Sequence, residues 1–227
     1  MYRVEDKYCC TATELIALQA RIGTVLRSDE NEGGSEGYSI TSLYFDDLRD
    51  SCLRDTEDGV NRRNKYRIRI YNNALNVIKL EVKTKQDNRI LKFSRSISIA
   101  EMKRLMNGEC IEDSASMEDP ATLFNLAIKT QGLRPRVIVS YERKAFVYEP
   151  GNVRITFDRN IRAGGRVEEF GQKNISYEFL REYDKVLEVK YDEFIPDFLL
   201  QLLETGRMRQ SAYSKYQLCR ECVDRQV

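Results

Sequence analysis

The sequence predicts an α+β fold with mostly antiparallel β-strands, about eight of them, and flanking helices. Several segments alternate charged and apolar residues, which is the period of a strand with one buried face. Short runs of Asn, Asp, Gly or Pro separate some of these segments and predict hairpin turns. The chain has 227 residues and shows no repeat or linker. We therefore expect one domain over residues 1–227.

The N-terminal part is expected to begin with a strand followed by a helix. Thr11 and Thr13 are candidate N-caps of that helix. Apolar residues then recur at helical spacing, at Leu15, Leu18, Ile22 and Val25. The expected elements of this part are a strand over 2–9, a helix over 12–26, a loop over 32–37, a strand over 39–45 and a short helix or turn region over 48–57.

The middle of the chain predicts an antiparallel meander. Strands are expected over 65–71, 77–85 and 90–97, with turns at Asn72-Asn73 and Asp87-Asn88. A helix over 99–106 and a polar, acidic segment over 109–119 follow.

The C-terminal part is expected to alternate strands and helices. Pro120 begins a helix that runs to 128, with Leu123, Leu126 and Ala127 facing inward. The remaining expected elements are a strand over 136–148, a turn at Pro150-Gly151, a strand over 153–158, an irregular segment over 160–177, a strand over 185–191, and helices over 196–203 and 211–222.

The charge balance limits the class of partner. Lys and Arg number 37 and Asp and Glu number 36, for a net charge of +1. A nucleic-acid binder usually shows a global basic excess, so we expect no nucleic-acid partner and only a local anion site. The acidic residues expected to lie outside that site are Asp29, Glu30, Glu32, Glu112, Asp113, Glu118 and Asp119.

The residue types that are missing narrow the chemistry. The chain has no histidine, which excludes Ser-His-Asp catalysis, Cys-His catalysis and His-ligated metal sites. It has no apolar run long enough for a transmembrane helix and no signal peptide, so we expect a cytoplasmic protein. Its six cysteines are expected to be free thiols.

The strongest functional pattern is the segment Lys65-Tyr66-Arg67-Ile68-Arg69-Ile70-Tyr71. Its alternation places Lys65, Arg67 and Arg69 on one face of a strand, about 6.5–7 Å apart. Similar charged faces are predicted within 79–85, 186–191 and 3–8, each with a Glu-x-Lys pattern. Such rows of cations favour a polyanion such as a phosphate chain. The interleaved glutamates would bind Mg²⁺ or Mn²⁺, and Arg143, Arg154 and Lys215 can join the cations.

Taken together, these segments resemble the VTC domain, a polyphosphate polymerase module within the triphosphate tunnel metalloenzyme, or CYTH-like, superfamily. The matching segments occur in the family's order and span nearly the whole chain. They are residues 3–8, Tyr44-Phe45-Asp46, residues 65–71, Leu80-Glu81-Val82-Lys83, residues 141–146, residues 154–158, Leu187-Glu188-Val189-Lys190 and Ser214-Lys215-Tyr216.

The resemblance implies that the strands close into a triphosphate-tunnel barrel and that specific residues bind phosphate and metal. Glu188 would be the main metal ligand, with Glu5 and Glu81 as helpers, and the metal would be Mn²⁺ or Mg²⁺. Residues with a direct role in catalysis would be Arg67, Arg69, Lys83 and Lys215. The phosphate-binding set would be Lys7, Lys65, Arg67, Arg69, Lys83, Lys92, Arg143, Arg154, Lys190, Ser214 and Lys215.

The same resemblance implies an activity and partners. Polymerases of this family transfer the γ-phosphate of ATP to a growing inorganic polyphosphate chain and release ADP. ATP and polyphosphate would be the partners, together with a separate membrane protein that takes the product at the inner face of a membrane.

Alternative interpretations stay open at this point. A single alternating strand is usually a solvated face, and Glu-x-Lys is commonly a cross-strand ion pair; for Glu81 the two interpretations are evenly balanced, whereas for Glu188 metal binding is favoured. Asp158 is expected to be a structural partner of a nearby arginine. A tunnel-type hydrolase of tripolyphosphate or nucleoside triphosphate, and a non-catalytic polyphosphate sensor, are the competing functions.

Overall fold

A computed structural model describes residues 4–29, 37–86, 89–180, 184–204 and 210–225. The Asp87-Asn88 turn, most of the 32–37 loop and the first residues of the 2–9 strand lie outside these residues. The chain divides into two compact units, which are described one at a time. Unit 1 comprises Met1–Ser39, Tyr141–Ile161 and Phe179–Tyr213, and unit 2 comprises Ile40–Ser140, Arg162–Glu178 and Ser214–Val227. That these units form a single domain stays a prediction.

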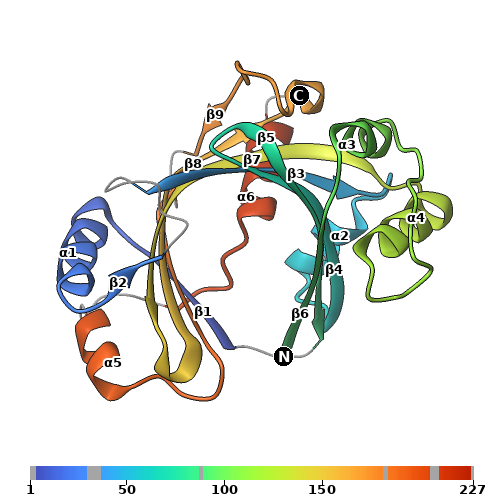
Figure 1. Cartoon of the computed structure of the whole chain (residues 1–227). Coiled ribbons are helices and arrows are strands. Elements are labelled where there is room, and N and C mark those ends of the chain that lie inside the picture. The colour runs from blue at the N-terminus through green and yellow to red at the C-terminus, as the bar shows by residue number, and fades with distance from the viewer. Residues whose placement is uncertain (1–3, 30–36, 87–88, 181–183, 205–209, 226–227) are drawn as a thin grey trace. The chain divides into compact units, whose positions relative to one another are not determined.

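The elements follow the expected mixture of strands and helices (Figure 1). The strands are β1 (Val4–Cys9), β2 (Arg27–Ser28), β3 (Tyr38–Asp46), β4 (Arg62–Tyr71), β5 (Ala74–Gln86), β6 (Arg89–Ser96), β7 (Arg134–Tyr148), β8 (Val153–Gly164), β9 (Glu178–Phe179) and β10 (Val186–Tyr191). The helices are α1 (Ala12–Gly23), α2 (Ser51–Glu57), α3 (Ile99–Met106), α4 (Pro120–Gln131), α5 (Asp197–Leu203) and α6 (Lys215–Asp224), with 3₁₀ turns at Pro150–Asn152 and Val167–Glu169. The α+β fold with antiparallel strands is confirmed.

Unit 1 is built on the strand order β1-β10-β8-β7. Both β1 and β8 pair antiparallel with β10, and Arg27 of β2 pairs with Val147 of β7. Helices α1 and α5 contact each other beside these strands (Figure 1). Helix α1 begins where the sequence predicts, because Thr11 and Glu14 form a reciprocal capping box.

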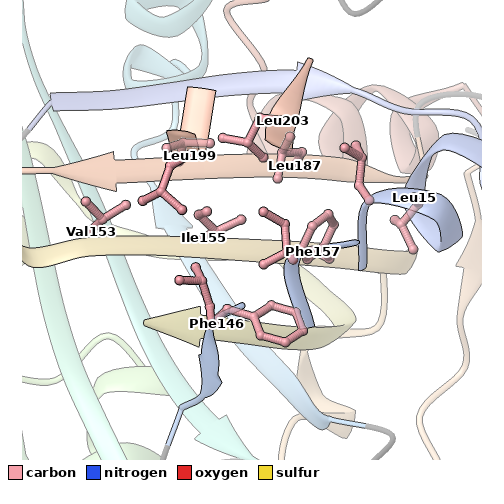
Figure 2. Close-up of a cluster of buried hydrophobic side chains, with 12 residues drawn as sticks. Leu15, Phe146, Val153, Ile155, Phe157, Leu187, Leu199 and Leu203 are labelled. Carbon is pink, nitrogen blue, oxygen red and sulfur yellow. The ribbon is translucent and has the colours of Figure 1, made fainter. Parts of the chain in front are cut away.

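The core of unit 1 lies between this sheet and the two helices. Side chains of Leu15, Phe157, Leu187 and Leu199 converge with their neighbours in one buried cluster (Figure 2). Phe146 packs edge-on against Phe157, with ring centroids 6.0 Å apart. The apolar positions of β8 and β10 therefore face the helices, which leaves their alternate, charged positions on the opposite face.

Unit 2 contains the predicted meander, in the order β7-β3-β4-β5-β6. Asn72 and Asn73, between β4 and β5, both have φ of 51°, as a two-residue hairpin with left-handed backbone requires. Helix α4 contacts β5 and β6, and α3 contacts β5. Phe124 of α4 packs edge-on against both Phe45 and Tyr66. The apolar face of the meander is covered in this way, and its cationic face is the other one.

Several expected boundaries differ from the structure. Strand β8 continues to Gly164, where an irregular segment was expected, because Ile161 and Ala163 are buried with a partly exposed residue between them. Helix α1 ends at Gly23, and Val25 is exposed. In α4 the buried stripe runs through Phe124 and Ala127, so Leu126 is exposed instead of inward.

Two further findings concern the termini of helices and the cysteines. The last helix begins at Lys215 and not at 211, because Ser214 caps it by accepting from the Gln217 N–H. All six cysteines are free. Among the helices described, none is long and apolar enough to cross a membrane.

Candidate functional site

The cationic face of unit 2 is formed by alternate positions of three neighbouring strands. Antiparallel pairing sets Arg67 opposite Glu81 and Arg69 opposite Lys79. The residues on this face are Arg63, Lys65, Arg67 and Arg69 of β4, Lys79, Glu81, Lys83 and Lys85 of β5, and Lys92 of β6. Glu81 is the single acidic residue in these three strands. The face therefore carries a large excess of positive charge.

Glu81 organises the centre of this face. Its side chain is 2% exposed, and it accepts from Arg67 Nε at 2.7 Å and from Lys92 Nζ at 2.8 Å. Arg69 Nε lies 3.8 Å from the same carboxylate. Burial by itself raises the pKa of Glu81, but these three cations outweigh burial and hold the pKa well below its usual range. Its contacts therefore favour a role as the ion-pair partner of these three side chains over a role as a metal ligand.

Three lysines form a row across the strands of unit 2. Lys65 pairs in register with Lys83, and Lys83 pairs with Lys92. Like charges directly opposite each other on a sheet are destabilising, and adjacent strands are only about 4.7–4.9 Å apart. An anion that bridged the three lysines would relieve this repulsion.

Two hydroxyl groups to which the sequence assigned no role fix the arginines of this face. Arg67 Nη1 donates to Tyr44 Oη at 2.9 Å, and Arg69 Nε donates to Ser42 Oγ at 3.2 Å. Tyr44 and Ser42 are opposite Arg67 and Arg69 in the β3–β4 register. The Tyr44-Phe45-Asp46 motif was a signal for Tyr44, but alternation along one strand does not show what lies across from it.

The Ser214-Lys215-Tyr216 motif lies at the start of α6 in unit 2. Ser214 Oγ accepts from Lys65 Nζ at 2.9 Å, so the structure brings these two predicted residues together. Lys215, the first residue of α6, is partly buried.

The charged face of unit 1 pairs opposite charges across two strands. Glu5 is opposite Lys190, and Lys7 is opposite Glu188. Lys7 Nζ lies 3.2 Å from Glu5 Oε1 and 3.8 Å from Glu188 Oε1. Lys190 Nζ lies 3.1 Å from Glu188 Oε2 and 4.0 Å from Glu5 Oε1. Two carboxylates and two ammonium groups thus form one compact cluster.

Arg143 extends this cluster into the interior of unit 1. Its guanidinium donates from Nε and Nη2 to both carboxylate oxygens of Asp158, at 2.6 and 2.7 Å, and Nη2 lies 3.5 Å from Glu188 Oε2. Burial lowers the pKa of Arg143, but Asp158 more than offsets this and holds the pKa above its ordinary value. The expectation that Asp158 is a structural partner of an arginine is confirmed. Gly37, with φ of +88°, contacts the Arg143 carbonyl so closely that a Cβ there would collide with it.

Arg154 has partners that the sequence did not predict. Its Nη2 lies 2.5 Å from Asp29 Oδ2 and donates to Tyr38 Oη at 3.2 Å. Asp29 is buried. The expectation that Asp29 lies apart from the predicted anion-binding residues was therefore wrong, because β2 pairs with β7 and the end of β2 comes beside Arg154.

The two carboxylates predicted to bind a metal, Glu5 and Glu188, lie close together in unit 1. Glu5 and Glu188 are both nearly buried, with side-chain exposures of 7% and 6%, and both lie within 4.0 Å of the same ammonium groups. Mg²⁺ is commonly bound by one or two carboxylates together with phosphate oxygens and water. Glu81, by contrast, is located in unit 2 with its three cations.

The predicted site residues thus form two sets. Unit 1 contains Glu5, Lys7, Arg143, Arg154, Glu188 and Lys190, and unit 2 contains Lys65, Arg67, Arg69, Glu81, Lys83, Lys92, Ser214 and Lys215. Their roles in phosphate and metal binding stay predictions.

The sequence model of one protein family, the VTC domain, matches residues 2–223. This chain belongs to the VTC domain family. The resemblance recognised from the short motifs is thereby confirmed, over nearly the whole chain. No curated protein matches this VTC domain in sequence.

Solved structures share the fold of this VTC domain. One is HpAC1 from Hippeastrum, an adenylyl cyclase candidate described as having a dominant triphosphatase activity, with 12% identity and a TM-score of 0.56 over 97% of this chain and 96% of that protein. Another is an adenylate cyclase candidate from Bacillus halodurans, with 14% identity and a TM-score of 0.53 over 89% of this chain and 87% of that one. At such identities the likeness concerns the fold alone.

Proposed function

We propose that this VTC domain is a polyphosphate polymerase that transfers the γ-phosphate of ATP to an inorganic polyphosphate chain and releases ADP. The observation that carries the proposal is the lysine row of unit 2, Lys65-Lys83-Lys92, next to Arg67 and Arg69 around a single carboxylate. A continuous row of cations fits a linear polyanion better than a single compact anion. Membership of the VTC domain family supports the same substrate class.

The transfer needs no histidine base. A terminal phosphate oxygen of polyphosphate attacks the γ-phosphorus, a new P–O bond forms, and the bond from the γ-phosphorus to the β–γ bridging oxygen breaks. The electron pair of that bond leaves with ADP. Because the attacking oxygen is already anionic, no proton has to be removed, which suits a chain without histidine. Catalysis is then a matter of positioning and charge stabilisation.

Each unit would supply a distinct part of this chemistry. In unit 2, Lys65, Lys83 and Lys92 bind the phosphate chain, and Arg67 and Arg69, aligned by Glu81, Tyr44 and Ser42, donate to its oxygens. Lys215 and Ser214, at the start of α6, add donors.

In unit 1, Arg143 is held rigidly by Asp158, and Arg154 by Asp29. With Lys7 and Lys190 they bind phosphate oxygens. Glu188 and Glu5 would hold a Mn²⁺ or Mg²⁺ ion. Such an ion, when bound, neutralises phosphate oxygens and supplies Lewis-acid stabilisation.

Hydrolysis of a triphosphate is the second candidate function. The described triphosphatase activity of HpAC1, which shares the fold, favours it. The two functions differ in whether water or phosphate attacks. A non-catalytic polyphosphate sensor would bind the same chain without turnover. A cytoplasmic location and a separate membrane partner are further expectations of the polymerase reading.

One incubation separates these functions. Purified protein is mixed with ATP and Mn²⁺, with and without a short polyphosphate primer, and ADP, free phosphate and long polyphosphate are assayed together. We expect ADP to be matched by polymer and both to be lost in Glu188→Ala. Free phosphate without polymer would identify a hydrolase, and tight polyphosphate binding without either product would identify a sensor.

A further inference from the structure

The buried carboxylate of Asp46, at the end of β3 in unit 2, accepts hydrogen bonds from several elements. The side chain is 0% exposed. Its Oδ1 accepts from the backbone N–H groups of Asp47 and Cys52, both at 2.9 Å, and its Oδ2 accepts from the Leu53 N–H at 3.1 Å. These bonds attach the start of α2 to the end of β3. The remaining bond goes to a side chain of α6.

That side chain is Tyr216, whose hydroxyl donates to Asp46 Oδ2 at 2.5 Å. Tyr216 is 2% exposed. Burial, reinforced by the charge of Asp46, raises the pKa of Tyr216, so the phenol stays protonated and remains a donor. The bond sets α6, and with it Ser214, at a defined position relative to β3 and β4 within unit 2.

The ring of Tyr216 continues the contact toward the cationic face. It stacks on the ring of Tyr44, with centroids 5.1 Å apart and an interplanar angle of 26°. Lys65 Nζ lies 5.8 Å from the Tyr216 centroid and donates to Ser214 Oγ. Arg67 donates to the Tyr44 hydroxyl. The stacked rings therefore contact both Lys65 and Arg67, which are neighbours on the same face of β4.

Neighbouring cations on a strand repel each other and rotate freely unless something fixes them. The aromatic pair contacts Lys65 by the ring face of Tyr216 and Arg67 by the hydroxyl of Tyr44. Arg67 is also paired through Nε with Glu81, so the tyrosines add orientation at Nη1 and at Lys65 without adding a second negative charge that would compete with a phosphate. This arrangement suits side chains that have to be in place before an anion arrives.

We propose that Tyr44 and Tyr216, the latter anchored by Asp46, are positioning residues that preset Lys65 and Arg67 for adjacent groups of a phosphate chain. The inference rests on the proposed function, since it assumes that unit 2 binds a phosphate chain. The sequence motifs contain all three residues, but nothing in the sequence assigns them this role.

The test uses tripolyphosphate binding by calorimetry, with chelator and without metal, at several salt concentrations. In Tyr216→Phe and Tyr44→Phe we expect binding about three- to tenfold weaker, with the salt dependence of the wild type, because every cation is still present. In Lys65→Ala we expect a loss of affinity together with a shallower salt dependence. Tyr66→Phe is the matched control, because its hydroxyl accepts from Asn64 on the opposite face of β4, and it should bind as the wild type does.

The outcomes are distinguishable. Wild-type affinity in both Tyr44→Phe and Tyr216→Phe, with wild-type protein binding tripolyphosphate, would overturn the positioning role. A wild-type protein that binds no tripolyphosphate would instead overturn the proposed function. If Tyr216→Phe proves unfolded by circular dichroism, Tyr44→Phe decides, since its hydroxyl contacts Arg67 and not the Asp46 anchor. An equal loss in Tyr66→Phe would also overturn the proposal, because the effect would then reflect general stability.

Discussion

The charged faces of the two units use the same residue types in different proportions. In unit 1, three carboxylates form ion pairs with three cationic side chains, so the charges of this cluster compensate one another. The carboxylates are those of Glu5, Glu188 and Asp158, and the cations are Lys7, Lys190 and Arg143. In unit 2, one carboxylate stands among a whole face of cations. Buried charges that are mutually paired satisfy one another, whereas like charges directly opposite each other on a sheet are destabilising. Under the proposed function, unit 2 would bind the phosphate chain and unit 1 would bind a metal ion together with phosphate.

The largest effect is expected from Arg67→Ala in unit 2. Loss of one preorganised donor should lower kcat by about 100- to 1000-fold, and it should also weaken tripolyphosphate binding without metal. Steady-state kinetics and calorimetry measure the two effects. Arg62→Ala is the control, because Arg62 is exposed on the same strand and faces the other way. Wild-type turnover in folded Arg67→Ala would contradict the assignment.

A different pattern is expected from Glu188→Gln in unit 1. Binding of Mn²⁺ should weaken at least about tenfold, and metal-dependent turnover should fall with it. Metal-free tripolyphosphate binding should not weaken, because the cations of unit 2 are intact. Electron paramagnetic resonance of free Mn²⁺ measures the binding of the metal, and calorimetry measures the binding of tripolyphosphate without metal. The control is Glu142→Gln, which removes a partly exposed partner of Arg159 and should change neither Mn²⁺ binding nor tripolyphosphate binding. Equal losses in both assays for Glu188→Gln would contradict the distinction between the units.

Glu81→Gln tests whether the single carboxylate of strands β4, β5 and β6 takes the place of a bound anion. Removal of one partner of a buried ion pair should cost about 3 kcal/mol of unfolding free energy at pH 7. The folded pKa of Glu81 is lowered, so its contribution is complete above the ordinary value of 4.5 and is lost as pH falls below it. The difference from wild type in urea unfolding should therefore shrink toward acid pH.

Added tripolyphosphate should restore much of the stability of Glu81→Gln, because phosphates replace the lost partner of Arg67 and Lys92. Failure of tripolyphosphate to stabilise the variant more than it stabilises the wild type would argue that Glu81 is an ordinary structural ion pair.

The smallest effect is expected from Lys190→Met. Its ammonium group lies 3.1 Å from Glu188 and competes with any metal for that carboxylate. Its removal should strengthen Mn²⁺ binding in the absence of phosphate by about fivefold, or about 1 kcal/mol. A resonance titration of Mn²⁺ measures it, with Lys185→Met, whose partner is Asp184, as the control. Unchanged or weaker binding would mean that the lysine does not compete.

Particular residues show which features of the site could be predicted from the sequence and which could not. Alternation predicted the shared face of Lys65, Arg67 and Arg69, and the structure has it on β4. Alternation also placed Glu81 beside cations but left its role balanced between an ion pair and a metal ligand. The register across β4, β5 and β6 gave Glu81 its three cations, and one strand carries no information about its partner strand's register.

The sequence by itself determined the fold class, the family and the charged faces, because the period of a strand and the order of short motifs are local properties of the chain. Only the tertiary structure decided which charges compensate each other. Asp29 reaches Arg154, Asp46 reaches Tyr216, and Lys7 reaches Glu188 across separations of more than 100 residues. Such contacts depend on strand pairing and helix packing, and electrostatic interaction falls with distance in space, not with distance along the chain.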